Sequence, residues 1–435
     1  MDYSLLRSRI YSDLLSLATQ DGINASGKDE IYGCIFGRDS AITILKILRI
    51  TNTPQARSLY NVSELQSMSR RALLKLVSLQ GKERVFESGE EPGKFIHEYR
   101  TEKYDHLLKL EKPWYVYPDG VMRNYDSLDS TPLALIAIYR YWQQTGDNEF
   151  LLEVLSAVEE GLNWIITYGD LDKDGLVEYE LPADRPYGGL PVQSWTDSYQ
   201  SISRLDGSMP AYPIAPVEVQ GYTWLALKLW GDFYTSSKQV GNTDVFGRKL
   251  LKFADRMKEQ FNKLFLFENH GMMFPVQALD GYKNQIKTVT GNPLLLLWAT
   301  YKNRGKTESI LEDKYVNALV KRAFLPDLFD LDAGIRTMSS TSDTFDSSKH
   351  SYHNGSFWPK LNGMSHEGLT NWGYTLEADL LKTATLKPIA YFGSPIELYM
   401  KNEENGEYFE FSCNGQTGCR VQAWSAAASL DLLTE

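Results

Sequence analysis

Apolar residues recur at three- and four-residue intervals along most of the chain, a spacing that places them on one face of an α-helix. The pattern predicts eleven helices, over residues 5–18, 40–50, 63–78, 131–144, 150–168, 217–234, 245–264, 293–303, 308–323, 367–383 and 421–433. A twelfth helix is predicted near residues 358–361 or 384–391. The protein is therefore expected to be all-α.

The connections between these helices are alternately tight and long. Residues 145–147 form a tight turn, whereas residues 81–126, 169–216, 326–357 and 387–420 are long and rich in Gly, Pro, aromatic and acidic side chains. Long loops inside a compact domain are usually functional. Helices joined in this way suggest a ring of helical hairpins, with the long loops gathered around a pocket at one end. Short β-hairpins are expected within these loops, near residues 94–100 and 407–411.

Two other helical architectures fit the same pattern, namely a generic bundle and a solenoid. A solenoid requires a sequence repeat of fixed period, and the chain shows none. No Gly/Ser-rich or Pro-rich linker divides the sequence, so residues 1–435 are predicted to form a single domain.

Charge and composition narrow the functional classes. The 45 basic and 56 acidic residues give a net charge of −11, which argues against a nucleic-acid or anionic membrane partner, because phosphate binding needs clustered Lys and Arg. No apolar run approaches the roughly 20 residues that span a bilayer, and the N-terminus lacks the pattern of a signal peptide. The three cysteines form neither a disulfide framework nor a zinc pattern. A cytoplasmic protein is expected, and the sequence predicts no particular oligomeric state.

Residues 170–181, DLDKDGLVEYEL, resemble a calcium-binding loop. Such a loop has acids at positions one, three and five, Gly at position six and a bidentate Glu at position twelve. Here Leu181 occupies the twelfth position, with Glu180 one place early. The alternative is an acid-rich turn in which Gly175 takes a positive φ and leads into a short strand. The sequence leaves both interpretations open, and no metal is predicted at the catalytic residues.

The side chains that could carry chemistry lie in the long loops and are mostly acids, amides and aromatics. Asp197 lies between Trp195 and Tyr199 with no basic residue nearby in the sequence, and Glu218 and Glu397 also have apolar neighbours. Acids and amides bind hydroxyl groups, and aromatic faces stack on C–H surfaces, so the combination suits a carbohydrate. The chain lacks the GxxxxGK[ST] motif of phosphate binding and the GxSxG elbow of serine hydrolases.

Hydrolysis of a glycosidic bond uses two carboxyl groups, one that donates a proton and one that activates water or attacks the sugar. Because an apolar, aromatic environment raises the pKa of a carboxyl group, Asp197 is the best candidate for the proton donor. Glu397 and Glu218 compete for the second role. Each acid also has a structural explanation: Asp39 and Asp129, for example, precede helices whose N-termini they would cap.

A series of short motifs extends this interpretation. In chain order they are GRDS (37–40), GKFIHEYR (93–100), DSTP (129–132), DGLVEYE (174–180), SWTDS (194–198), PIAPVEVQGY (213–222), GIRT (334–337), HNGSFWP (353–359), PIELY (395–399) and QAWSAA (422–427). With these motifs in this order, the chain resembles the amylo-α-1,6-glucosidase family, which comprises the glucosidase portion of glycogen debranching enzymes and its bacterial and archaeal relatives. The resemblance covers most of the chain.

The resemblance implies an (α/α)6 barrel, that is, six helical hairpins in a toroid with long loops and short β-hairpins at the pocket end. It implies hydrolysis of α-glucosidic bonds with inversion and without a cofactor. The general acid of the family falls on Asp197 and the general base on Glu397, where the sequence reads PIEL instead of PEL. The positions expected to bind the sugar are Arg38, Asp39, Glu98, Arg100, Asp129, Trp195, Glu218, His353, Trp358 and Trp424.

Alternatives to this function remain. Debranching enzymes usually carry an additional N-terminal portion that this sequence lacks, which favours a small α-glycoside such as trehalose, sucrose or a glucosyl- or mannosyl-glycerate. A second hypothesis is a sugar-binding barrel without activity. A third is a sugar epimerase or lyase, for which only His97 and His353 are suitably placed bases.

Overall fold

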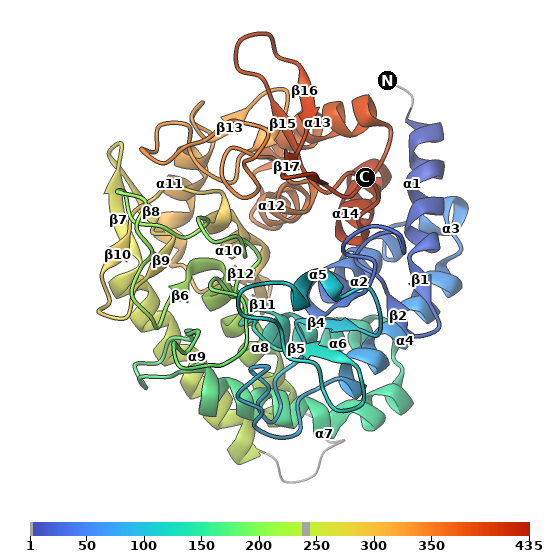
Figure 1. Cartoon of the computed structure of the whole chain (residues 1–435), viewed down its shortest axis with the longest axis vertical. Helices are drawn as coiled ribbons and strands as arrows, with labels where there is room; N and C mark the ends of the chain where they lie inside the picture. Colours follow the sequence, from blue (N-terminus) through green and yellow to red (C-terminus); the bar gives the residue numbers. More distant parts are fainter. Residues whose placement is uncertain (1–2, 237–243) are drawn as a thin grey trace.

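The computed structural model describes residues 3–236 and 244–435, and within these ranges the protein is mostly helical (Figure 1). The predicted domain over residues 1–435 also includes residues 1–2 and 237–243, which lie outside the described residues. The longer helices are α1 (Ser4–Ser16), α2 (Gly37–Thr51), α4 (Val62–Ser78), α6 (Ser130–Thr145), α7 (Asn148–Trp164), α8 (Val217–Ser236), α9 (Asp244–Leu264), α11 (Asp313–Ala323), α12 (Pro359–Asn371), α13 (Thr375–Phe392) and α14 (Ala423–Thr434). The shorter helical segments are α3 (Ala56–Leu59), α5 (Asp105–Leu108), η1 (Ile165–Gly169), η2 (Asn292–Leu294) and α10 (Leu295–Trp298).

A ring of helices forms the centre of the molecule. Each helix contacts the next in the order α2, α6, α8, α10, α12 and α14, and α14 returns to contact α2 (Figure 1). The helices α1, α4, α7, α9 and α13 pack against the outside of this inner ring, and α11 packs against η2, which directly precedes α10. This arrangement is consistent with six helical hairpins in a toroid.

The burial of the inner and outer helices explains why the sequence forms two layers. In the inner helix α8, every residue from Val217 to Leu227 is buried, as expected for a helix that is covered on all sides. In the outer helix α9, the buried residues form a single stripe at three- and four-residue spacing: Gly247, Leu250, Ala254, Met257 and Phe261. The charged residues of α9 cover its other face, which is the amphipathic pattern of a helix on a surface.

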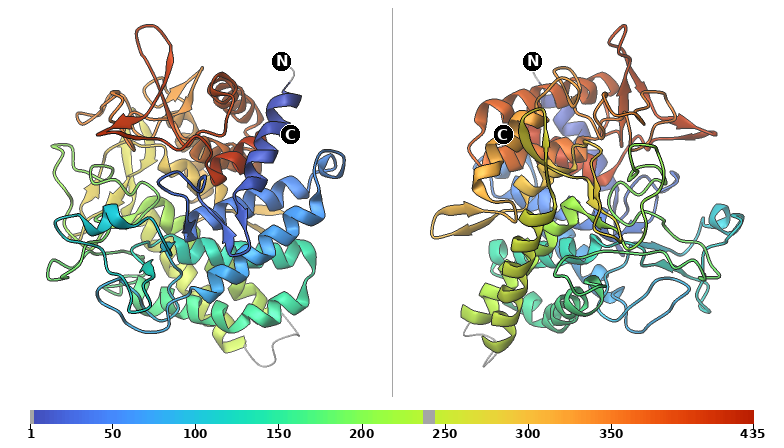
Figure 2. Two further views of the ribbon diagram at one scale, coloured as in Figure 1. Left: turned by 45° about the vertical axis from the view of Figure 1, so that its right-hand side comes forward. Right: turned by 90° about the vertical axis from the view of Figure 1, so that its left-hand side faces the viewer.

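The long loops gather at one end of the helices (Figure 2). They contain two three-stranded antiparallel sheets. One joins β3 (Ile35–Phe36), β4 (Glu98–Arg100) and β5 (Met122–Asn124), and the other joins β6 (Ala215–Pro216), β9 (Ala278–Leu279) and β10 (Gln285–Ile286). The remaining strands form antiparallel pairs: β1 (Ala18–Thr19) with β2 (Gly22–Ile23), β7 (Leu266–Asn269) with β8 (Met272–Pro275), β11 (Tyr301–Asn303) with β12 (Lys306–Glu308), β13 (Phe329–Asp330) with β14 (Gly334–Ile335), β15 (Tyr399–Lys401) with β16 (Tyr408–Glu410), and β17 (Ser412–Cys413) with β18 (Gln416–Thr417).

Several predicted elements differ from the observed ones. The predicted helix over residues 367–383 is wrong, because α12 ends at Asn371 and α13 begins at Thr375, with Gly373 at a φ of +78° between them. The apolar periodicity continues across this break and hides it. The two positions considered for a twelfth helix, residues 358–361 and 384–391, lie at the start of α12 and within α13. The predicted helix over residues 293–303 is correct only as far as Trp298, where α10 ends, and β11 follows it.

The hairpin predictions had opposite outcomes. Residues 407–411 do contribute the second strand of a hairpin, since β16 pairs with β15. Residues 94–100 do not form a hairpin: β4 is the middle strand of its sheet and pairs with two segments that are distant in sequence. Such pairings leave no local turn signal.

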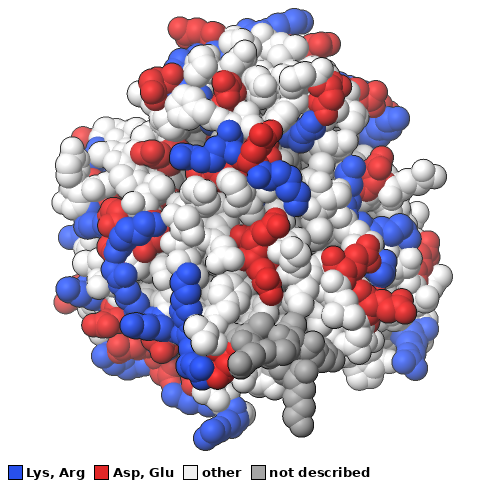
Figure 3. Space-filling view, turned by 90° about the horizontal axis from the view of Figure 1, so that it is seen from below, with Lys and Arg blue, Asp and Glu red and all other residues white. Residues whose placement is uncertain are grey.

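The helices, surface charges and cysteines of the described residues bear on the classes of protein considered for the sequence. None of the described helices is both long and apolar enough to cross a bilayer. On the face shown in Figure 3, basic and acidic side chains are mixed. The cysteines Cys34, Cys413 and Cys419 are free thiols.

Candidate active site

A narrow cavity of about 40 Å³ lies where the inner helices α2, α12 and α14 begin. Residues of these helix starts and of the long loops line it: Tyr32, Phe36, Arg38, Asp39, Trp195, Asp197, Tyr352, His353, Trp358, Glu397, Gln422 and Trp424. Both predicted catalytic residues and most of the predicted sugar-binding residues are therefore brought together, from segments that are far apart in the sequence.

Arg38, in the first turn of α2, lies between two acids. Its Nη1 donates to Asp129 Oδ1 over 3.2 Å, and its Nη2 donates to Asp197 Oδ2 over 2.7 Å. Asp197 is thus paired, although no basic residue lies near it in the sequence. Burial raises the pKa of Asp197 and Arg38 opposes this effect, with a net pKa above the usual value. Asp197 therefore retains a proton to higher pH than an exposed Asp does.

Glu397 lies just before β15, and both of its carboxylate oxygens accept hydrogen bonds. The Tyr352 hydroxyl donates to Oε1, and the Cys419 backbone N–H donates to Oε2 over 2.7 Å. Burial raises the pKa of Glu397 to about 7, although both hydrogen bonds favour the carboxylate. A carboxyl group with a pKa near neutrality is suited to accept a proton at neutral pH.

The position of Glu397 in the PIEL segment follows from the burial of its neighbours. Ile396 and Leu398 are both buried within hydrophobic clusters, whereas Glu397 lines the cavity. The acid of this segment is therefore the side chain that faces the cavity.

Aromatic rings form one wall of the cavity. The His353 ring stacks on Trp358 with 4.7 Å between centroids, and Trp195 meets Trp358 edge-on at 5.6 Å. Burial, followed by the charges of Arg38 and Lys360, holds the pKa of His353 well below its usual value. The imidazole is therefore neutral, and its Nδ1 accepts a hydrogen bond from the Ser198 N–H over 3.3 Å. A wall of this kind presents flat apolar faces to a ligand.

The other predicted site residues lie at different depths. Asp39 lines the cavity, and burial raises its pKa to about 7. Asp129 lies behind Arg38 and is not among the lining residues. Glu218 is also deeper: its Oε2 accepts from Asn292 Nδ2 over 3.3 Å, and Asn292 Oδ1 accepts from Trp195 Nε1 over 3.2 Å. Glu218 therefore fixes the position of the Trp195 ring in the cavity wall through Asn292.

Glu98 and Arg100 lie in β4 and form a buried ion pair with each other. Arg100 Nη2 also donates to the Ile31 carbonyl oxygen over 2.8 Å. Neither side chain is among those that line the cavity. Through these contacts, Glu98 and Arg100 stabilise the segment that contains Tyr32 and Phe36.

The sequence interpretation missed some of the residues at this site. Tyr32, Phe36, Tyr352 and Gln422 line the cavity, and the last three adjoin or begin the GRDS, HNGSFWP and QAWSAA motifs. Lys360 lies beneath the wall, with its Nζ 4.0 Å from the centroid of the Trp195 ring. Nothing in the sequence around Lys360, a single Lys after Trp-Pro, predicts that its side chain lies under the aromatic wall.

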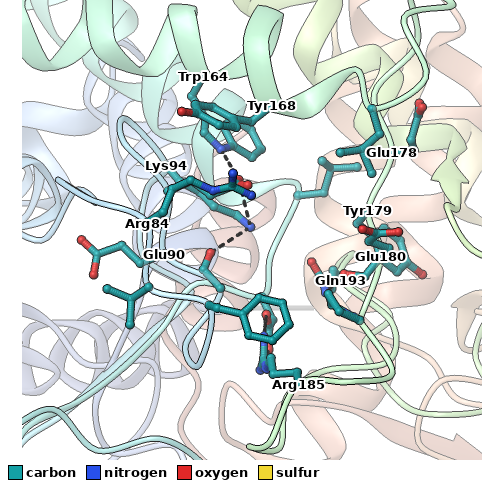
Figure 4. A pocket seen from close by; sticks show the side chains of 18 residues that line it. Arg84, Glu90, Lys94, Trp164, Tyr168, Glu178, Tyr179, Glu180, Arg185 and Gln193 are labelled. Carbon is teal, nitrogen blue, oxygen red and sulfur yellow. Dashed lines mark hydrogen bonds and ion pairs between the residues drawn. The ribbon is translucent and has the colours of Figure 1, made fainter.

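A second cavity, of about 370 Å³, lies apart from these residues (Figure 4). Its walls include Trp164 and Tyr168 from the end of α7 and η1, and Lys94 lies over the Trp164 ring at 5.4 Å. Arg185, another lining residue, forms a two-bond ion pair with Asp126. No residue is shared between the linings of the two cavities.

Comparison with known proteins identifies the family. Residues 113–431 match the profile of the amylo-alpha-1,6-glucosidase family. The chain belongs to this family. No curated protein matches the sequence. The protein is therefore a member of a glycoside hydrolase family.

Solved structures share the fold of this amylo-alpha-1,6-glucosidase family member. The GH63 mannosylglycerate hydrolase from Thermus thermophilus in complex with glucose has 15% sequence identity and a TM-score of 0.65, with 98% of this chain and 99% of that chain covered. The same hydrolase in complex with Tris and D-glycerate has 14% identity and a TM-score of 0.64 over the same coverage. A Streptococcus pneumoniae structure, described with metal-independent alpha mannosidases and bound to alpha-1,6-mannobiose, has 14% identity and a TM-score of 0.56, with 99% and 92% covered.

Proposed function

We propose that the protein is an inverting α-glycosidase built on an (α/α)6 barrel, with Asp197 as general acid and Glu397 as general base. The observation that carries this proposal is the meeting of these two carboxyl groups in one narrow cavity with aromatic walls. The closed ring of inner helices supports the barrel, since each catalytic segment lies where the loops join that ring.

The proposed reaction is a single displacement at the anomeric carbon. Asp197 gives its proton to the glycosidic oxygen, while Glu397 takes a proton from a water molecule that attacks the opposite face of the sugar. The bond from the anomeric carbon to the leaving oxygen breaks as the bond to the water oxygen forms. Because Arg38 holds Asp197 Oδ2, we place the transferred proton on Oδ1. Inversion requires the two carboxyl groups to lie about 6.5–9.5 Å apart, with space for water.

The shape of the site supports a terminal glycosyl unit as the substrate. The cavity is narrow, which does not suit a polymer chain lying across it. A neighbouring hollow of about 300 Å³ shares Tyr352 and His353 with the cavity and is also lined by Ser198, Gln200 and Asn354. We assign this hollow to the leaving group, because it adjoins the cavity at the residue next to Asp197.

The charges around the two spaces favour a neutral leaving group. Among the described residues that line them, Arg38 is the only Lys or Arg, and it is already bound by Asp129 and Asp197. We therefore propose a small α-glucoside as the substrate, with the α-1,6 linkage of the family as the first to test. A glycosyl-glycerate is the second candidate, because the Thermus hydrolase structures cover almost the whole chain. Its carboxylate would need a cation that the lining does not otherwise supply.

The test is to incubate the enzyme with a panel of α-glycosides that includes isomaltose, trehalose, sucrose and mannosylglycerate, and to follow the anomeric protons by NMR. Release of the β-anomer of the sugar from an α-glycoside is the expected result. A cleaved glycosyl unit that first appears as the α-anomer would overturn inversion. With trehalose the leaving glucose keeps its α configuration, so inversion there gives equal amounts of β- and α-glucose at first. Binding of sugars without release from any member of the panel would instead support a sugar-binding protein.

The epimerase or lyase hypothesis receives less support from the geometry. His97 is buried and is not among the lining residues, and His353 is held at Nδ1 by the Ser198 N–H. We also retain the cytoplasm as the proposed location, because all three cysteines are free.

A further inference from the structure

The loop after η1 brings four carboxyl groups together outside the candidate active site. Asp170, Asp172, Asp174 and Glu178 each place one oxygen within 4.8 Å of the others. Ca²⁺ binds oxygen ligands at about 2.3–2.6 Å, so two oxygens on the same ion lie at most about 4.6–5.2 Å apart. The spacing of the cluster therefore matches a single shared ion.

The backbone of the loop has the form that its sequence suggests. The Gly175 N–H donates to Asp170 Oδ2 over 3.2 Å, and the Leu176 N–H donates to Asp174 Oδ1 over 2.8 Å. Gly175 has a φ of +98°, which only glycine adopts readily. Leu181, at the twelfth position of the motif, cannot supply a ligand, but Glu178 brings a carboxyl group into the cluster from the ninth position instead.

Two carboxyl groups of the cluster each have one buried oxygen without a hydrogen bond. No donor among the described residues reaches Asp170 Oδ1 or Glu178 Oε2, and these residues are only 1% and 2% exposed. A buried carboxylate oxygen without a partner is costly. Both residues contribute to the cluster, so a bound cation would satisfy oxygens that the protein leaves without partners.

The protein supplies one cation to the cluster. Lys283, in the turn between β9 and β10, places its Nζ 2.7 Å from both Asp172 Oδ2 and Asp174 Oδ2 and 3.9 Å from Glu178 Oε1. The other basic residues that face the loop are used elsewhere: Lys173 Nζ donates to the Asp170 and Thr167 carbonyls, and Arg256 donates to the Lys173 carbonyl. One ammonium group therefore faces four acids.

We propose that this cluster is a Ca²⁺ site at which Lys283 takes the place of the ion when none is bound. The Lys283 side chain is 25% exposed, so it can move outward when Ca²⁺ arrives. A small, strongly hydrated Mg²⁺ demands octahedral geometry and keeps its waters, which makes it a poorer fit to this loop. Because the loop leads from η1 into the segment that carries Asp197, bound Ca²⁺ anchors one end of that segment.

The experiment is calorimetric titration of the chelator-treated, full-length protein with CaCl₂, together with its thermal unfolding midpoint. Wild type is expected to bind one Ca²⁺ with a Kd at the weak end of loop sites, about 10⁻⁴–10⁻³ M, and to gain thermal stability. Lys283→Met removes the competing ammonium group and should bind about tenfold more tightly, in line with the charge dependence of such loops. Asp172→Asn should lose most of the binding.

Two controls make the result decisive. Asp206→Asn changes an exposed Asp that accepts a hydrogen bond from the Ser208 N–H in another glycine-containing turn, and it should bind Ca²⁺ as wild type does. MgCl₂ at the same concentrations should give a much smaller stabilisation. Absence of Ca²⁺ binding by wild type, or an equal response to Mg²⁺, would overturn the proposal and leave Lys283 as a permanent counter-ion. Neither readout depends on catalysis, so this test is independent of the proposed function.

Discussion

Glu397 is subject to two opposing influences, since burial favours its neutral form and the hydrogen bonds from Tyr352 and Cys419 favour its charge. Tyr352→Phe removes one of these donors and should raise the pKa of Glu397 further above about 7. A general base works only when ionised, so the acidic limb of the pH profile of kcat/KM should move to higher pH, with less activity at neutral pH.

Kinetics across the pH range will check this shift. Tyr125→Phe is the matched control, because the Tyr125 hydroxyl is also buried but donates to the Leu79 carbonyl, away from the cavity. Its profile should follow that of wild type. An unchanged or lowered acidic limb in Tyr352→Phe would show that Tyr352 does not hold the charge of the base.

Asp197→Asn tests the proton donor. We expect kcat to fall by about 10²–10⁴-fold for a natural α-glycoside, the usual contribution of general acid catalysis. An aryl glycoside with a leaving group of low pKa needs little protonation, so the loss should be much smaller with that substrate. Equal losses on the two substrates would contradict the assigned role. Circular dichroism will check that the fold is retained.

At the scale of elements, α2 must begin at a glycine. A Cβ at Gly37 would lie 2.0 Å from the Ile96 carbonyl oxygen, which belongs to the chain beside β4 and cannot rotate away. Gly37→Ala should therefore move the start of α2, and with it Arg38. We expect the free energy of unfolding to fall by about 1–3 kcal/mol and activity to be lost. Denaturant unfolding and kinetics will measure both.

A glycine with open space around it provides the comparison. Gly120 has a φ of +77° and nothing within 4 Å of an added Cβ, so Gly120→Asn should have little effect, since Asn tolerates this conformation. Full activity in Gly37→Ala would show that the start of α2 is not fixed by this contact.

The sequence predicts an element well when the residues of that element determine its structure, and less well when contacts with distant segments determine it. The stripe of α9 and the positive φ of Gly175 are local, and both were predicted from their own residues. The break between α12 and α13 was missed because apolar periodicity continues across it. At the site, the aromatic residues beside Asp197 in the sequence identify it as a candidate. Its ion pair with Arg38 could not be predicted, because only the ring of helices brings these two segments together. Lys360 has no local signal at all.

At the scale of the whole molecule, buried charges join the two ends of the chain. Lys46 on α2 donates to Asp431 on α14 over 2.8 Å and to Glu367 on α12 over 2.7 Å. Lys46→Met leaves both acids without this partner, and removal of one partner from a buried ion pair costs about 3–5 kcal/mol. We expect a matching fall in the denaturant midpoint at neutral pH. Burial raises the pKa of Glu367, but Lys46 and Arg49 lower it to a net value below the usual one, so the loss should shrink as pH falls and Glu367 becomes protonated.

Lys28→Met is the matched control for this network. Lys28 is 76% exposed and lies 4.0 Å from Glu102, so its removal should change stability very little. Similar midpoints for Lys46→Met and wild type at neutral pH would mean that the closure of the ring does not depend on these charges.

The closure of the ring by its last helix has a consequence for biosynthesis. The cavity takes Arg38 from near the start of the chain and Glu397 and Trp424 from near its end, and α14 packs against both α1 and α2. Synthesis proceeds at about 5–20 residues per second, so the growing chain carries Arg38 well before Glu397, the proposed general base, has been added. The proposed site can therefore form only once α14 has been made and has packed against α1 and α2.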